Sequence, residues 1–179
     1  PGSDLLVLCF TRAAVREISS RLRKLVASNE AHDDLRFVSV RTFDSFATRL
    51  LLDVDPDDEL EEYGYDKRIE RAVDLLNDGK GEASEMMVAV KHLIVDEIQD
   101  LVGVRAQLVQ LLLERISGGF TLLGDPAQAI YNFSLRDSND MNSDQLIEWV
   151  RKHEWRHAIR ENGLTTNFRS TSEMEEITD

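Results

Sequence analysis

Two adjacent carboxylates, Asp96 and Glu97, follow the apolar run in HLIVDEIQDL (residues 92–101). At the carboxyl end of a buried strand, such a pair suits two tasks in phosphoryl transfer: one carboxylate binds Mg²⁺ and the other polarises the attacking water. Taken alone, the pair also fits a plainer interpretation, in which acidic side chains favour the positive end of the following helix. The neighbouring strand ends are needed to choose between the two.

A second polar turn, GDPAQAIYNF (residues 124–133), also follows an apolar run. Gly124 permits a tight exit from a strand, and Gln128 offers an uncharged hydrogen-bonding group. Tyr131 and Phe133 stand two apart where no strand pattern continues, which favours stacking on nucleic-acid bases. The plainer alternative is ordinary turn chemistry at the Gly-Asp-Pro step.

The elements that must position these residues are strands that alternate with amphipathic helices. Residues 4–10 form a strand-length apolar run, and the helical pattern that follows starts after Thr11, the expected N-cap. The order then recurs: strand 36–43 with a helix capped by Asp44, strand 91–97 with helix 103–116, and strand 120–125. Because the strands lack alternating polarity, they predict an α/β fold in which helices cover both faces of a parallel sheet.

Residues 53–90 interrupt this rhythm. They contain an acidic stretch, a helix at about 68–77 and a polar loop, and we expect a small helical insertion on the sheet. A short capped helix is predicted at 142–152, and the Ser170/Glu173 spacing predicts the start of another.

The composition favours one globular domain and a cytoplasmic setting. With 179 residues and 42% apolar content, the chain can bury one ordinary core. No apolar run exceeds six residues, so neither a membrane span nor a signal peptide is expected. Cys9 is the only cysteine, which excludes a disulfide within the chain, and its apolar surroundings predict a buried thiol.

The net charge of −13 at first argues against a nucleic-acid partner, because such binding relies on Lys and Arg. The charge is unevenly distributed, however. Residues 53–66 carry eight acidic and no basic side chains, whereas residues 1–52 carry eight Lys and Arg against six Asp and Glu. The N-terminal part therefore remains compatible with a polyanion.

Five segments, in one order, resemble the motifs of the first motor domain of UvrD/Rep-like superfamily 1 DNA helicases. They are VLCFTRAAVREISSRL (motif Ia), VRTFDSFATRLL (Ib), LIVDEIQDL (the DExQ Walker B box), LLGDPAQAIYNF (III) and LTTNFRST (IV). The resemblance implies a RecA-like sheet of the P-loop NTPase type. It also implies a helicase or translocase that uses ATP and Mg²⁺ to move on single-stranded DNA, or at a junction with duplex, with 3′ to 5′ polarity.

The same resemblance implies roles for single residues. Asp96 would bind Mg²⁺, Glu97 would activate the water beside it, and Gln99 would link the nucleotide to motif III. Gln128 would sense the γ-phosphate, which Arg169 would approach as an arginine finger. The implied nucleic-acid contacts are stacking by Phe10, Tyr131 and Phe133, and approach to phosphates or bases by Thr11, Arg12, Thr42 and Ser45.

Plainer roles stay open for several of these residues. Phe10 fits the last core position of its strand, and Thr11 fits a helix cap. Thr42 fits turn packing, and Arg169 fits an ion pair with Glu173 or Glu175.

The sequence departs from the family pattern most clearly in the phosphate loop, since no GxxxxGK[ST] occurs. In the family that loop precedes motif Ia, so we expect a fragment that lacks the Walker A segment and most of the second motor domain. Such a fragment alone is expected to lack ATPase activity and to leave the edge of strand 120–125 open. Asp44 also replaces a His common in motif Ib, and Phe133 replaces a Trp.

The expected organisation is a 1A motor domain from residues 1–52 and 91–160, a 1B-like insertion at 53–90, and the start of the second motor domain at 161–179. We expect the missing parts of the same protein to be its partners. We expect no membrane partner. A catalytically silent, helicase-like module that binds nucleic acid or protein is the alternative.

Overall fold

The computed structural model of the chain describes residues 5–28, 30–78, 87, 89–125 and 141–163. The chain divides into two compact units, Pro1–Ile147 and Glu148–Asp179, and each is described by itself. Among the described residues, no helix combines the length and the apolarity needed to cross a membrane.

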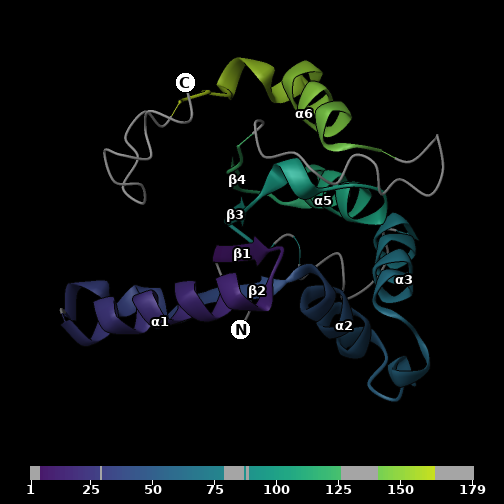
Figure 1. The fold of residues 1–179 in the computed structure, drawn as a ribbon, viewed down its shortest axis with the longest axis horizontal. Helices are drawn as coiled ribbons and strands as arrows, with labels where there is room; N and C mark the ends of the chain where they lie inside the picture. Colours follow the sequence, from purple (N-terminus) through teal and green to yellow (C-terminus); the bar gives the residue numbers. More distant parts are fainter. Residues whose placement is uncertain (1–4, 29, 79–86, 88, 126–140, 164–179) are drawn as a thin grey trace, which may run out of the picture. The chain divides into compact units, whose positions relative to one another are not determined.

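The first unit is built on a four-stranded sheet. Its strands are β1 (Leu5–Cys9), β2 (Val38–Thr42), β3 (His92–Val95) and β4 (Gly119–Leu122). They lie in the order β2-β1-β3-β4, and every neighbouring pair is parallel (Figure 1). This confirms the predicted α/β class and parallel sheet. Within the described sheet, β2 and β4 are the two edge strands.

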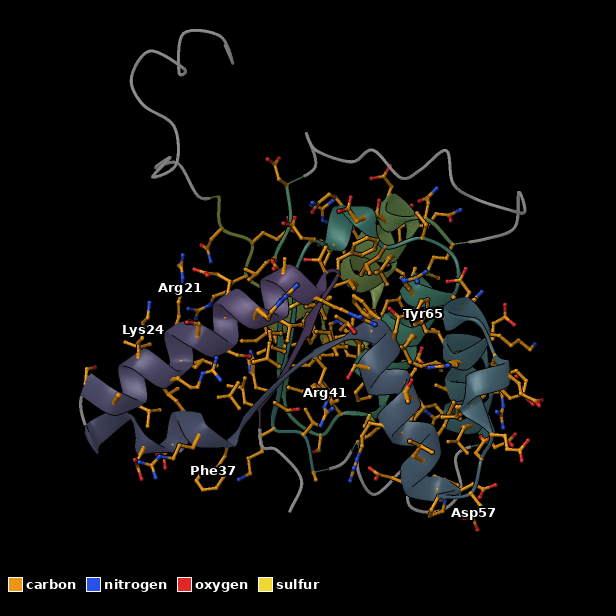
Figure 2. All side chains as sticks on the ribbon, turned by 60° about the horizontal axis from the view of Figure 1, so that its bottom comes forward. Arg21, Lys24, Phe37, Arg41, Asp57 and Tyr65 are labelled. Atoms are coloured by element: carbon orange, nitrogen blue, oxygen red, sulfur yellow. The ribbon has the colours of Figure 1, made fainter. Side chains whose placement is uncertain are left out.

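Four helices of the first unit cover this sheet. They are α1 (Arg12–Ser28), α2 (Phe43–Val54), α3 (Tyr65–Asp78) and α5 (Val104–Arg115). The chain moves one way from β1 to β2 and the opposite way from β2 to β3 and on to β4, so right-handed crossovers place α1 on one face and the other helices on the opposite face. Figure 2 shows this division, with α1 on one side of the strands and α2, α3 and α5 on the other. Both faces are covered, as predicted.

The core lies mainly between the strands and the layer of α2, α3 and α5. Leu8, Leu93 and Val95 of the sheet are fully buried, as are Leu50 of α2 and Ile69 of α3. The predicted helix at 68–77 is therefore present in α3, and it packs against both α2 and α5. Helix α1 buries none of its residues completely.

The predicted cap of α2 was wrong, and the predicted cap of α1 is confirmed. Thr42, not Asp44, is the N-cap of α2: its backbone is extended, and its Oγ1 accepts a hydrogen bond from the Ser45 N–H at 3.2 Å. Asp44 already lies in the first helical turn, where a side chain cannot take the cap position. At α1, Thr11 Oγ1 accepts the Ala14 N–H at 3.1 Å.

Three short 3-10 segments connect these elements: η1 (Glu30–Phe37), η2 (Leu60–Glu62) and η3 (Ile98–Asp100). Helix α6 (Ser143–Lys152) matches the capped helix predicted at 142–152. Asn142 and Gln145 bond reciprocally at its start, with the Gln145 N–H donating to Asn142 Oδ1 at 2.8 Å and the Asn142 N–H donating to Gln145 Oε1 at 2.9 Å.

The second unit contains the end of α6 and the 3-10 segment η6 (Glu154–Ala158). His153 stacks on Trp155 with ring centroids 3.6 Å apart, and Trp149 meets Trp155 edge-on at 5.5 Å. Arg151 binds both carboxylate oxygens of Glu161, at 2.7 and 2.8 Å. The predicted helix start at Ser170 and Glu173 lies outside the described residues.

Candidate functional site

The predicted site residues that the structure describes gather at one edge of the sheet. In the parallel register, Leu8 of β1 lies beside Arg41 of β2 and Val95 of β3, and Val95 lies beside Leu122 of β4. The segments that follow the four strands therefore leave from the same edge, where ligands bind in open α/β sheets.

Three backbone hydrogen bonds fix the turn after β3. The Asp96 N–H donates to the Leu8 carbonyl at 2.9 Å, and the Ile98 N–H donates to the Leu123 carbonyl at 2.9 Å. The Leu123 N–H in turn donates to the Val95 carbonyl at 2.8 Å. Residues 96–98 are thereby held between the ends of β1 and β4. Their positions therefore depend on the positions of both strands.

Glu97 has a left-handed backbone, with φ 56° and ψ 49°, and is the one described non-glycine residue with a positive φ. Such a conformation costs a side-chain-bearing residue about 1–2 kcal/mol and persists only when surrounding contacts enforce it. The side chain of Glu97 is exposed, and its Oε2 accepts a hydrogen bond from Gln99 Nε2 at 2.5 Å. The turn thus presents a hydrogen-bonded carboxylate to solvent from a strained backbone.

Gln99 is the buried link of the site, with 4% of its surface exposed. While its amide nitrogen donates to Glu97, its Oε1 accepts the Asp125 N–H at 3.0 Å. Gly124 makes this approach possible, because a Cβ there would lie 2.7 Å from Gln99 Oε1 and 2.6 Å from Ile98 Cγ1. The structure thus brings Gln99 together with the first part of the segment predicted to be motif III.

Burial and negative charge shape the electrostatics of this turn. The pKa of Asp100 is raised by desolvation and then by the charge of Glu97. Burial, with a smaller contribution from Asp96, raises the pKa of the Cys9 thiol to about 11. Cys9 is fully buried and free, as predicted, so it acts as a packing residue and not as a nucleophile at neutral pH.

The donor set around Asp96 and Glu97 bears on whether this turn could hold Mg²⁺. In the described part of the chain, no three His, Cys, Asp or Glu side chains are grouped so that they could hold a metal ion. Mg²⁺ is commonly held by one or two carboxylates and completes its shell with water and phosphate oxygens. The half-buried Asp96 beside the exposed Glu97 is compatible with that smaller donor set.

The predicted nucleic-acid residues after β1 and β2 also lie at this edge. Thr11 and Thr42 each accept a backbone N–H as helix caps, yet a hydroxyl that accepts can still donate its own proton to a phosphate oxygen. Arg12 and Ser45 are exposed, and Phe10 is half-buried at the end of β1. Arg12, Thr42 and Ser45 line one groove.

Arg105 is a residue of this region that the sequence did not single out. It lies in the first turn of α5, where Nη1 is 2.9 Å from Asp66 Oδ1 and Nη2 is 3.6 Å from Asp44 Oδ1. Its guanidinium carbon is also 6.0 Å from the centroid of the Phe10 ring. Phe10 follows β1, Asp44 lies in α2 and Asp66 lies in α3, so no local sequence signal could have identified Arg105.

The remaining predicted site residues, Gln128, Tyr131, Phe133 and Arg169, lie outside the described residues.

Comparison with known proteins finds similarity to helicases. The family model "UvrD/REP helicase N-terminal domain" matches residues 54–146, just over half of the chain. A protein of Acanthamoeba polyphaga mimivirus, named "Putative ATP-dependent DNA helicase R568", is 27% identical across 96% of this chain. The matched part covers 22% of that viral protein, so the chain spans about a fifth of the length of its relative.

Proposed function

The chain belongs to the UvrD/REP helicase family, and we propose that it forms part of a motor that uses ATP to move on single-stranded DNA. The observation that carries the proposal is the chain of contacts from Glu97 through Gln99 to Asp125. A motor must couple ATP hydrolysis to movements elsewhere in the domain. The buried amide of Gln99 hydrogen-bonds both to Glu97 after β3 and to Asp125 after β4, which supports such a coupling.

We assign the nucleotide chemistry to the turn after β3. Asp96 would hold Mg²⁺, which when bound neutralises charge on the phosphates of ATP. Glu97 would accept the proton of the attacking water, and its hydrogen bond from Gln99 orients the carboxylate for that task. Gln128 and Arg169 are proposed to contact the γ-phosphate.

We assign the nucleic-acid contacts to the segments after β1 and β2. Arg12, Thr42 and Ser45 line one groove, and this supports a common role in contacting phosphates. Phe10 and Thr11 lie next to Arg12, and we propose that they take part with Tyr131 and Phe133 in base stacking and backbone contact. The Walker A segment and second motor domain are the proposed intramolecular partners.

The test uses Glu97→Gln in the full-length protein, with Glu114→Gln as a control because Glu114 is an exposed acid on α5. Steady-state ATP hydrolysis in the presence of single-stranded DNA should fall about 10²–10⁴-fold in Glu97→Gln. Binding of a fluorescent ATP analogue should stay within about twofold, because the substitution removes a base and not a phosphate ligand. Glu114→Gln should hydrolyse ATP at the wild-type rate.

Unchanged turnover in Glu97→Gln would refute the role of Glu97. A wild-type protein that binds single-stranded DNA but never hydrolyses ATP would instead favour the silent binding module.

A further inference from the structure

Arg105, in the first turn of α5, contacts residues of three segments that precede it in the sequence. Its Nη1 lies 2.9 Å from Oδ1 of Asp66 at the start of α3, and its Nη2 lies 3.6 Å from Oδ1 of Asp44 at the start of α2. Its guanidinium carbon lies over the ring of Phe10, which follows β1, at 6.0 Å from the ring centroid. The proposed function gives Phe10 a role in base stacking and gives Arg105 none.

The charge of Arg105 is committed to its two carboxylate partners. Asp44 Oδ1 is buried and accepts no hydrogen bond within the described residues, so it depends on the nearby guanidinium to compensate its charge. Only 23% of the Arg105 side chain is exposed. Because one cation faces two carboxylates, this trio as a whole does not attract a phosphate. Arg105 is therefore poorly suited to bind a nucleic-acid backbone directly.

The same contacts place Arg105 where it can orient the ring of Phe10. The pairing of β1 with β2 ends at Cys9, one residue before Phe10, and Phe10 itself is half-buried. A guanidinium over an aromatic ring is attracted to its π-electrons. When that guanidinium is itself held by carboxylates of two helices, the ring beneath it is restrained as well. A ring that is already oriented loses less freedom when a base stacks on it.

We propose that Arg105 is a positioning residue, which holds the ring of Phe10 in the orientation that stacks on an unpaired base. Asp44 and Asp66 hold the guanidinium in place, and Arg105 acts through the ring without contacting phosphates. The inference rests on the proposed function, in which Phe10 stacks on a base. It makes the orientation of that ring depend on the starts of α2, α3 and α5, which meet at Arg105.

The test measures binding of a fluorescein-labelled 20-nucleotide oligothymidine to the full-length protein by anisotropy, without nucleotide, at several salt concentrations. The variant Arg105→Met/Asp66→Asn removes one positive and one negative charge, so the net charge stays that of the wild type. It should bind about fivefold more weakly, because the ring is no longer held. The slope of log affinity against log salt should stay unchanged, because no phosphate contact is lost.

The matched control is Arg71→Met/Asp58→Asn, which removes the same kind of contact at another aromatic ring. Arg71 Nη2 lies 2.7 Å from Asp58 Oδ2, and the guanidinium carbon of Arg71 lies 4.6 Å from the centroid of the Tyr63 ring. The side chain of Arg71 is 32% exposed, which is close to the value for Arg105. This control should bind the oligothymidine within about twofold of wild type, although it also loses an ion pair and an arginine–ring contact.

A double-mutant cycle with Phe10→Ala tests whether Arg105 acts through the ring. Phe10→Ala alone should weaken binding by about tenfold, because one base loses its stacking partner. Adding Arg105→Met/Asp66→Asn to Phe10→Ala should weaken binding by less than about twofold more, because no ring is left to hold. A merely structural role of Arg105 would instead produce the same fivefold loss in both backgrounds.

Asp66→Asn alone provides a second test, which remains available if the double variant unfolds. This substitution removes a negative charge, so electrostatics alone would make the protein bind the oligothymidine more tightly. Because the guanidinium of Arg105 loses its partner at 2.9 Å, we expect binding about two- to threefold weaker than wild type. The two explanations thus predict changes of opposite sign.

Three results would each overturn the proposal: wild-type affinity in Arg105→Met/Asp66→Asn, equal losses with and without the Phe10 ring, or unchanged or tighter binding by Asp66→Asn. Wild-type affinity in Phe10→Ala would overturn it through its premise, the stacking role of Phe10. Failure of the proposed function is distinguishable from all of these, because the wild-type protein itself would then not bind the oligothymidine.

Discussion

Gln99 Oε1 accepts the backbone N–H of Asp125 at 3.0 Å, although 26 positions separate the two residues in the sequence. The same side chain donates to Glu97, so one buried amide connects the turn after β3 with the end of β4. A displacement of Asp125 would therefore act on the same side chain that hydrogen-bonds Glu97.

Gly124→Ala should break this link. The new Cβ would lie 2.7 Å from Gln99 Oε1 and 2.6 Å from Ile98 Cγ1, so both neighbours would have to move. We expect the free energy of unfolding to fall by about 1–3 kcal/mol, measured by urea denaturation. Gly64→Ala is the matched control, because a Cβ at Gly64 meets no atom within 4 Å. Equal stability of the two variants would contradict the proposed clash.

Glu97→Gly should be more stable than Glu97→Gln. Both variants lose the carboxylate, but only glycine adopts a φ of 56° without steric cost. The difference in unfolding free energy should be about 1 kcal/mol in favour of glycine. If denaturant titrations showed that Glu97→Gln is as stable as Glu97→Gly, or more stable, the left-handed conformation of Glu97 would store no strain.

Thr42→Ala should destabilise the protein by about 1 kcal/mol, because α2 loses its N-cap. Thr42→Ser should retain that stability, measured by thermal unfolding, because the serine hydroxyl can accept the Ser45 N–H in the same way. Oligothymidine affinity should also survive in Thr42→Ser, since the hydroxyl proton remains available. A serine variant with normal stability but weak DNA binding would show that the methyl group of Thr42, and not its hydroxyl, matters for DNA.

Arg105→Met should lower the free energy of unfolding by about 1–2 kcal/mol, because Asp44 and Asp66 then lose a cationic partner in partly buried surroundings. Asp66→Asn in the Arg105→Met background should recover part of the loss. A double-mutant cycle over these two substitutions, measured by urea unfolding, should give a coupling of about 0.5–1 kcal/mol. A coupling near zero would mean that this ion pair does not help to hold α5 against α3.

Much of the architecture could be predicted because it depends on local patterns. Strand-length apolar runs and helical spacing located the four strands and the helices that cover them, and Thr11 marked the start of α1. The cap of α2 was misplaced by two residues, since Asp44 and Thr42 are both acceptable cap types and only the backbone conformation distinguishes them.

The sequence by itself determined the parallel α/β sheet, the position of Asp96 and Glu97 at a strand end, and the family resemblance. Only the tertiary structure decided which distant groups meet: Gln99 with Asp125, and Arg105 with Asp44 and Asp66. Periodicity records which side of an element faces the core, because burial depends on neighbours a few positions away. Hydrogen bonds and charge pairs between elements depend on strand order and crossover direction, which bring together residues from separate parts of the chain.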